Sequence, residues 1–230
     1  MPAKPKTERS APKHRAKRAW IQRHVSDPFV QASKREGYRS RAAYKLLEID
    51  RKDHLLRPGS LVIDLGAAPG SWAQVAVERL GRRGGQLAGR VIALDLLPVE
   101  PIAGVEFLQG DIREEQVMER LEEMLKGERA DLVLSDLAPN LSGIGAADAA
   151  RSAHLWELAL EFAVKHLKPS GCLLVKTFQG SGHSQFVQAL KRHFVRVQVR
   201  KPAASRQESA ETYLLARGLK PDLRLEAKAA

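Results

Sequence analysis

The stretch that decides the fold is residues 61–72, which read LVIDLGAAPGSW. Leu61 to Leu65 form an apolar run of strand length, Gly66 and Gly70 bracket a turn, and a helical pattern opens at Ser71. A short β-branched run followed by a turn and a helix is typical of a βαβ unit. The stretch therefore predicts a strand, a glycine turn and a helix within a parallel sheet.

The same alternation continues along the chain. Six further strands are expected at Val91–Asp95, Val105–Leu108, Leu132–Ser135, Cys172–Phe178, Val195–Val199 and Tyr213–Ala216. Helices are expected at Pro28–Glu36, Arg41–Asp50, Ser71–Arg79, Glu114–Leu125, Asp148–Leu167 and Ser184–Arg192, with Pro169 and Gly171 ending the longest of them. This pattern predicts an α/β fold with a doubly wound, mainly parallel, seven-stranded sheet. No helix separates the last two strands, which predicts an antiparallel hairpin at one edge.

Composition limits the class of protein. The chain has 230 residues, of which 43% are hydrophobic and 28% charged, and this suits one globular domain with an appendage. Cys172 is the one cysteine, no metal-ligand spacing occurs, and no run approaches the roughly 20 apolar residues of a membrane span. We therefore expect a cytoplasmic monomer without a bound metal or a membrane partner.

The positive charge is concentrated near the N-terminus. The net charge is +11, and residues 1–57 hold 16 Lys or Arg against 6 Asp or Glu, whereas residues 58–230 hold 22 against 21. A segment this basic fits a polyanion such as nucleic acid. An anionic membrane surface and a solubilising tail are the alternatives. We predict a disordered arm at 1–18, one domain at 19–218 and a short tail at 219–230.

Carboxylates follow the predicted strands. Asp95 ends the second strand, Asp111 follows the third and Asp136 follows the fourth. An acid at the end of the second strand can bind two ribose hydroxyls. The turn lacks the GxGxxG pattern, and Pro69 removes a donor that a pyrophosphate would need. This favours S-adenosylmethionine, an adenosine cofactor without phosphates, over a nicotinamide dinucleotide. A glycine turn that serves packing alone is the other interpretation.

Lys176 is the most unusual charged residue, because it lies inside the apolar run from Leu173 to Phe178. Lysines are rarely buried without a partner, so Lys176 either reaches solvent at the strand end or pairs with a carboxylate such as Asp136. Lys45, opposite the apolar stripe of its helix, and Glu211, before the last strand, are by themselves unremarkable.

Six segments of the chain occur in an order that is typical of one enzyme family. They are SRAAYKL at 40–46, DLGAAPGSW at 64–72, DLLP at 95–98, LSDLAPN at 134–140, VKTFQG at 175–180 and KPAASRQESAETY at 201–213. In these segments the chain resembles the FtsJ-type RNA 2'-O-ribose methyltransferases, and it is most similar to the bacterial form that methylates a uridine of large-subunit ribosomal RNA. The likeness extends from about Arg18 to Gly218.

The resemblance implies specific roles for the residues at these positions. The implied catalytic tetrad is Lys45, Asp136, Lys176 and Glu211, with Lys176 as the base that removes the proton of the ribose hydroxyl. The implied positions for S-adenosylmethionine are Gly70, Trp72, Asp95, Asp111 and Asp136. Two features depart from the family pattern: Ser71 replaces a glycine, and Arg82 to Gly89 lengthen a connection.

The expected partner is ribosomal RNA, within the large ribosomal subunit. Arg39, Arg41 and the N-terminal arm are expected to contact phosphates on one side of the site, and Arg200, Lys201 and Arg206 on the other. Three alternatives remain at this point. They are a transfer RNA 2'-O-methyltransferase, a non-catalytic RNA-binding factor for ribosome assembly, and a nicotinamide oxidoreductase, because a fold alone does not fix a function.

Overall fold

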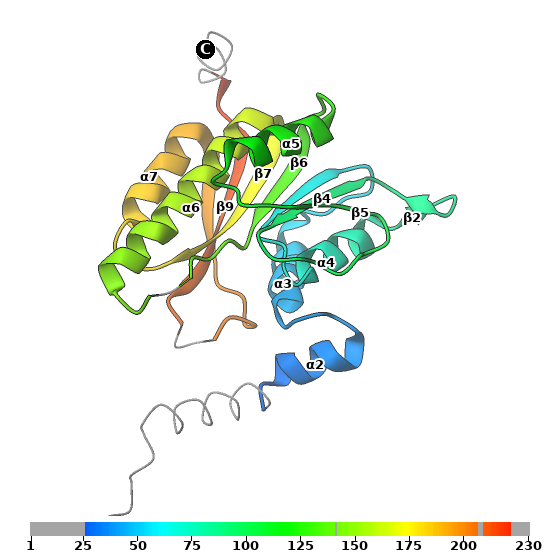
Figure 1. The fold of residues 1–230 in the computed structure, drawn as a ribbon, viewed down its shortest axis with the longest axis horizontal. Helices are drawn as coiled ribbons and strands as arrows, with labels where there is room; N and C mark the ends of the chain where they lie inside the picture. The colour runs from blue at the N-terminus through cyan, green and yellow to red at the C-terminus, as the bar shows by residue number, and fades with distance from the viewer. Residues whose placement is uncertain (1–25, 141, 207–208, 222–230) are drawn as a thin grey trace, which may run out of the picture.

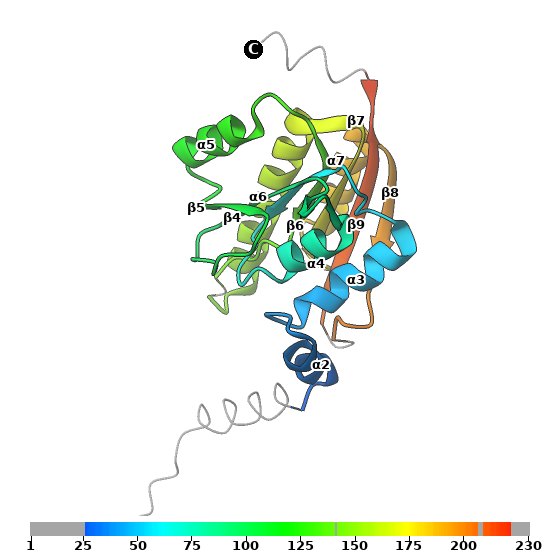
Figure 2. The same ribbon diagram turned by 90° about the vertical axis from the view of Figure 1, so that its right-hand side faces the viewer.

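The computed structural model describes residues 26–140, 142–206 and 209–221, and its centre is a twisted sheet between two layers of helices (Figures 1 and 2). The strands are β1 Leu61–Leu65, β4 Arg90–Asp95, β5 Val105–Gln109, β6 Ala130–Ser135, β7 Leu167–Phe178, β8 Phe194–Arg200 and β9 Glu211–Leu219. Their order is β5-β4-β1-β6-β7-β9-β8. Only β9 runs against its neighbours. The predicted seven-stranded, doubly wound sheet is confirmed.

The described residues include six helices. They are α2 Pro28–Glu36, α3 Ala42–Asp53, α4 Ser71–Leu80, α5 Glu115–Leu125, α6 Gly145–His166 and α7 His183–His193. Helices α3 to α7 cover the sheet, and α2 lies apart from it (Figures 1 and 2). One apolar cluster joins α3 and α4 to one face of the sheet, and a second joins α5, α6 and α7 to the other face. The sheet is therefore covered on both sides, as a parallel sheet requires.

The alternation of side chains along the central strands decides which groups reach each layer. All five residues of β1 are buried. Ile63 and Leu65 pack with the α5, α6 and α7 layer, whereas Val62 packs with the α3 and α4 layer. Because successive side chains in a strand point to opposite faces, Asp64 lies on the same face as Val62. The residue pattern thus turns an acidic side chain toward α3 and α4.

Three details differ from the predictions or extend them. Helix α6 ends at His166, three residues before Pro169, because Leu167 is fully buried and already pairs with Ala130 of β6. Residues 82–87 form a small hairpin, β2 Arg82–Arg83 with β3 Gln86–Leu87, where a plain connection was expected. The predicted antiparallel edge is confirmed, since β9 lies between β7 and β8. No described helix is long and apolar enough to span a membrane.

Candidate active site

The site lies at the carboxyl ends of the parallel strands, where the order of strands reverses. From β1 the chain moves to β4 and β5 on one side, and later to β6 and β7 on the other. Ligands of open α/β sheets bind in the crevice that this reversal leaves. In Figure 1 this end of the sheet faces α2 and the loop before β9.

The turn after β1 depends on two glycines with positive φ. A Cβ atom on Gly66 would lie 2.8 Å from the backbone nitrogen of Leu137, and one on Gly70 would lie 2.7 Å from Nη1 of Arg39. Both positions also have φ in the left-handed range, at +80° and +105°. Glycine is therefore required for this turn to pass close to the loop after β6 and for α4 to begin at Ser71.

The carboxylate of Asp95 holds this turn in place. Its Oδ2 accepts a hydrogen bond from the Ala68 amide and its Oδ1 accepts one from the Leu97 amide, both at 2.8 Å. Each oxygen keeps a second lone pair, so the carboxylate can still accept hydrogen bonds from a ligand's hydroxyl groups. Asp95 therefore stands where a ribose-binding acid is expected.

Two other predicted cofactor positions have protein partners of their own. The carboxylate of Asp111 forms a salt bridge and hydrogen bonds with Arg113, which hold the pKa of Asp111 below its usual value. The ring of Trp72 is only 2% exposed, and its Nε1 donates to the carbonyl oxygen of Ala42. The indole thus belongs to the core, and what Trp72 offers to a ligand is its backbone in the first turn of α4.

Lys176 is held by Asp136, as its place in an apolar strand indicated. The lysine side chain is 8% exposed. Its Nζ donates to the carbonyl oxygen of Asp136 at 2.6 Å and lies 3.1 Å from Oδ1 of the same residue. Apart from its bond to Cε, Nζ has three positions for hydrogen atoms or a lone pair. Two of them are directed at Asp136, and the third remains for a substrate.

Lys45 and Glu211 form the second ion pair of the site. Nζ of Lys45 lies 2.8 Å from Oε1 and 2.9 Å from Oε2 of Glu211, and both side chains are 13% exposed. Burial acts to raise the pKa of Glu211, but Lys45, Ser205 and Lys176 outweigh it and hold that pKa below its usual value. The structure therefore brings the four residues of the predicted tetrad together from α3, β7, β9 and the loop after β6.

Tyr213 connects the two ion pairs and was missed by the sequence analysis. Its hydroxyl donates at 3.3 Å to both Asp136 and Glu211, and its ring packs 5.7 Å from that of Trp72. Burial raises its pKa well above the usual value, so the hydroxyl remains a donor. Its position two residues after Glu211, on the same face of one strand, was the available signal.

Arg39 and Arg41 are positioned differently from the expectation that they bind RNA phosphates. The guanidinium of Arg39 donates to the carbonyl oxygens of Pro69, Glu100 and Pro101. The guanidinium of Arg41 pairs with Asp27, the residue that caps α2. Both arginines therefore connect backbone segments around the site.

Ser71, the departure from the family's glycine, also turns away from the crevice. It is 2% exposed, and its hydroxyl lies 2.7 Å from the hydroxyl of Ser40. This hydrogen bond joins the start of α4 to the segment that precedes α3. The serine is therefore accommodated by packing between elements.

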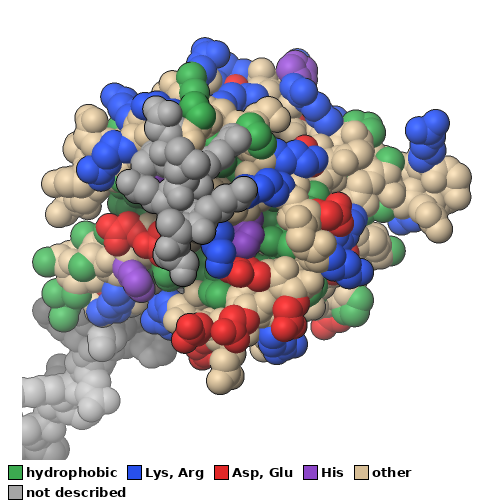
Figure 3. All heavy atoms as spheres, turned by 90° about the horizontal axis from the view of Figure 1, so that it is seen from above, with side chains coloured by type: hydrophobic (Ala, Val, Ile, Leu, Met, Phe, Trp, Pro, Cys, Tyr) green, Lys and Arg blue, Asp and Glu red, His purple; other side chains and the backbone are tan. Residues whose placement is uncertain are grey.

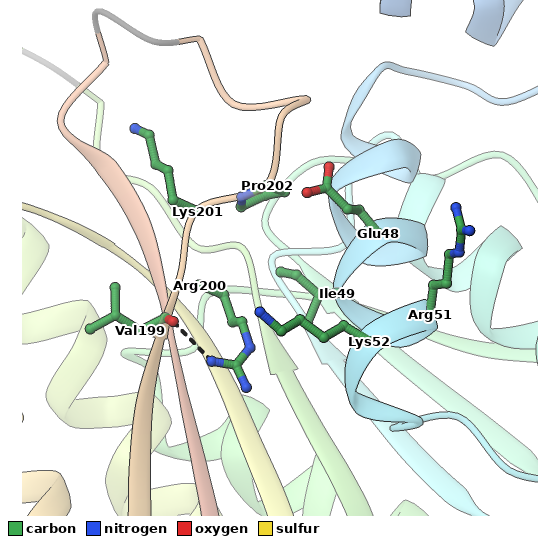
Figure 4. Close-up of a pocket in the computed structure, with 8 residues that line it drawn as sticks. All are labelled: Glu48, Ile49, Arg51, Lys52, Val199, Arg200, Lys201 and Pro202. Atoms are coloured by element: carbon green, nitrogen blue, oxygen red, sulfur yellow. Dashed lines mark hydrogen bonds between the residues drawn. The ribbon is translucent and has the colours of Figure 1, made fainter.

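Arg200 and Lys201 line a cavity of about 370 Å³ between α3 and the end of β8 (Figure 4). Nε and Nη2 of Arg200 each donate a hydrogen bond of 2.6 Å to a carboxylate oxygen of Asp53. Nζ of Lys201 donates to the carbonyl oxygens of Ser209 and Glu211. These two cations therefore connect α3, β8 and the loop before β9, and their expected contact with RNA stays a prediction.

Arg206 keeps the freedom that the expected contact with RNA requires. Its side chain is 43% exposed, and its Nε lies 3.9 Å from Oδ2 of Asp27. A separation of this size on an exposed side chain contributes little to stability. Of the five predicted arginine and lysine contacts, Arg206 is thus the one whose guanidinium has the loosest hold on the protein.

Comparisons with known proteins agree with this geometry. The family model for FtsJ-like methyltransferases matches residues 38–219. Ribosomal RNA large subunit methyltransferase E of Bordetella parapertussis is 59% identical over 208 residues, which cover 90% of this chain and 99% of that protein. The protein of the same name from Burkholderia mallei is 55% identical, covering 90% and 98%. The crystal structure of a ribosomal RNA methyltransferase from Plasmodium falciparum has a TM-score of 0.69 at 32% identity, covering 79% of this chain and 98% of that one.

The sheet order, the glycine turn and these likenesses define an S-adenosylmethionine-dependent methyltransferase. The family model matches residues 38–219, which is most of the chain, and this identifies the family within that class of enzyme. The chain belongs to the FtsJ-like methyltransferase family. This membership excludes the nicotinamide oxidoreductase that the sequence left open.

The residues at the crevice fit S-adenosylmethionine. The turn at Gly66 and Gly70 brings backbone close to the site without side chains, and the carboxylate of Asp95 can still accept hydrogen bonds of the kind that a ribose donates. Asp64 adds a fully buried carboxylate that has no cation beside it among the residues that the structure describes, which suits a ligand that carries positive charge. Among the described residues no group of His, Cys, Asp and Glu could hold a metal ion.

Proposed function

We propose that this chain transfers a methyl group from S-adenosylmethionine to the ribose 2'-hydroxyl of a uridine in large-subunit ribosomal RNA. The observation that carries the proposal is the meeting of two ion pairs, Lys176 with Asp136 and Lys45 with Glu211, beside the glycine turn. The names of its relatives support the choice of RNA. We further propose that it acts in the cytoplasm as a monomer.

The chemistry requires a base and close positioning. S-adenosylmethionine, when bound, supplies a methyl group on a positively charged sulfur. Lys176 acts here as the free amine: its Nζ takes the proton of the 2'-hydroxyl as the oxygen attacks, while Asp136 holds that nitrogen through two contacts. Lys45 orients the hydroxyl, and Glu211 fixes Lys45 through both of its carboxylate oxygens. Tyr213 keeps the two carboxylates at a fixed separation.

The described side chains at the far end of the molecule carry both signs of charge. Figure 3 views the protein from the end opposite the site, and basic and acidic side chains are interspersed over that face. RNA phosphates are attracted by clustered positive charge. We therefore propose that RNA approaches the end of the sheet that carries the tetrad.

Methyl transfer to defined RNA tests the proposed function. Large ribosomal subunits from cells that lack this activity, and transfer RNA from the same cells, are incubated with the protein and labelled S-adenosylmethionine, and 2'-O-methyl groups are mapped. We expect one new methyl group on a uridine of large-subunit RNA. Label in transfer RNA alone would establish the other RNA as substrate. Binding to the subunit without methylation would mean a non-catalytic assembly factor.

The N-terminal arm provides a second prediction, although it lies outside the described residues. Residues 1–24 hold eight Lys or Arg and one Glu. Deleting residues 1–17 should weaken RNA binding at low salt and flatten the slope of log affinity against log salt by about 0.7 to 0.9 per lost phosphate contact. The measurement is RNA affinity at several salt concentrations. Cofactor affinity and the modified nucleotide should not change, and equal slopes would mean a solubilising tail.

A further inference from the structure

Asp64 is a buried carboxylate for which the mechanism so far has no use. It is fully buried near the carboxyl end of β1, and no described residue forms a hydrogen bond of good geometry with its side-chain oxygens, although the Ala73 amide of α4 acts to lower its pKa. The other carboxylates of the site are paired, Asp136 with Lys176 and Glu211 with Lys45. Leaving a buried acceptor without a partner costs about 1–3 kcal/mol, and more for a charged group. A group kept at that cost in a ligand crevice points to a ligand that balances it.

The surroundings of Asp64 are acidic on both sides. Asp95 ends the neighbouring strand β4 and Asp136 follows the other neighbour, β6. Burial and these two carboxylates raise the pKa of Asp64 to about 8, against the Ala73 amide of α4, which lowers it. Lys176 on β7 is not among the groups that act on Asp64, and its Nζ is held by Asp136.

The remaining charged groups near this face are also engaged or distant. Lys45 of α3 is held by both oxygens of Glu211. Glu78 of α4, at the other end of its helix from Ala73, accepts a hydrogen bond from Tyr38, and Arg79 lies 3.7 Å from Asp50. Without a ligand, burial and the two neighbouring carboxylates therefore favour the protonated form of Asp64.

A cation entering this crevice would change that state, because a nearby positive charge favours the ionised carboxylate. S-adenosylmethionine has a positively charged sulfur, whereas the product left after methyl transfer has a neutral thioether. We propose that Asp64 distinguishes the cofactor from the product by releasing a proton when the cationic form binds and regaining it when the charge is lost. This inference rests on the proposed function.

The charges balance over one reaction. The oxygen–carbon bond forms as the carbon–sulfur bond breaks, the electrons of that bond stay on sulfur, and the hydroxyl proton goes to Nζ of Lys176. Loss of the positive charge leaves ionised Asp64 facing Asp95 and Asp136 without compensation, so Asp64 takes a proton from water. Binding of the product is thereby weakened relative to binding of the cofactor.

Calorimetry at several pH values tests this assignment. S-adenosylmethionine, S-adenosylhomocysteine and the amine analogue sinefungin are titrated between pH 6.5 and 8.5, in two buffers of different ionisation enthalpy. For the unchanged protein, we expect S-adenosylmethionine to release up to one proton more than S-adenosylhomocysteine near neutral pH. The ratio of their affinities should rise with pH by up to tenfold per unit below the pKa of Asp64 and then level off. Sinefungin, which is also cationic, should behave like the cofactor.

Asp64→Asn and a matched surface control complete the experiment. Asparagine keeps the shape of the side chain but does not titrate. For Asp64→Asn, the ratio of the affinities for S-adenosylmethionine and S-adenosylhomocysteine should therefore change with pH only as far as the amino groups of the ligands titrate, which they do with both proteins. Glu106→Gln, on the exposed side of β5, should retain the full pH dependence of the unchanged protein. If Asp64→Asn retains it as well, the inference is wrong. If it does not fold, equal proton release by cofactor and product in the unchanged protein overturns the inference. Absence of any cofactor binding would count against the proposed function instead.

Discussion

Replacing Lys176 with methionine is expected to slow methyl transfer by about 100- to 10,000-fold, the usual contribution of a general base. Methionine is close to lysine in size and occupies the same space beside the apolar strand, but it cannot accept the hydroxyl proton. The Lys176 side chain is 8% exposed and lies against Asp136. Because a base acts on the hydroxyl proton in the transition state, we expect the substitution to lower the turnover rate and to leave cofactor binding nearly unchanged. The measurement is single-turnover methyl transfer together with calorimetric affinity for S-adenosylmethionine, which should stay within about threefold of the unchanged protein.

Lys168 supplies the matched control for this substitution. It lies on the same strand, β7, at the end away from the site, and pairs with Asp131. Lys168→Met should leave methyl transfer unchanged, since a partly exposed ion pair contributes about 1 kcal/mol or less to stability. Near-normal turnover by Lys176→Met would instead assign a structural role to Lys176 and make Lys45 the candidate base.

The fold was predictable because its signals are local. Apolar runs of strand length and helical periodicity are carried by adjacent residues, and α2 and β1 have the predicted bounds. The small hairpin of residues 82–87 could not be predicted, because its strands have two residues each and no apolar pattern. The start of β7 was predicted at Cys172 and lies at Leu167, because the pairing of Leu167 with Ala130 is a long-range contact.

The four residues of the predicted tetrad do meet in the structure, but the protein partners of the other candidate residues were less predictable. Lys176 stood out because an apolar strand contained it, and the structure provides the expected carboxylate in Asp136. The arginines gave no such signal. Arg39 and Arg200 are satisfied by backbone carbonyls and by Asp53, contacts that form only once distant segments meet. A cation near a site in sequence is therefore weak evidence for a contact with RNA.

The burial of Asp64 could not be predicted from its local sequence either. In the sequence it is one acid in an apolar run, which is compatible with a strand end open to solvent. Its environment depends on the neighbours that the sheet order supplies, with Ala93 of β4 on one side and Leu134 of β6 on the other. Only the topology shows that Asp95 and Asp136 then lie within electrostatic range.

Gly66→Ala is expected to destabilise the protein by about 3 kcal/mol and to weaken both cofactor binding and methyl transfer. A left-handed backbone conformation costs a non-glycine residue about 1–2 kcal/mol. The added Cβ would also lie 2.8 Å from the Leu137 nitrogen, which is closer than real Cβ atoms approach other atoms, and 3.1 Å from the Asp136 carbonyl carbon, which is tighter than most real contacts. The loop after β6 would have to move, and Asp136 and its contact with Lys176 would move with it.

Gly59→Ala separates the two contributions. Gly59 has nearly the same φ, +86° against +80° for Gly66, but a Cβ there meets no atom within 4 Å. This control should lose about 1–2 kcal/mol from backbone strain alone and keep normal cofactor affinity. Chemical unfolding and calorimetry on both variants measure the difference. Equal losses of stability with intact cofactor binding would show that the approach of Gly66 to Leu137 can relax, and that the glycine serves the turn without positioning Asp136.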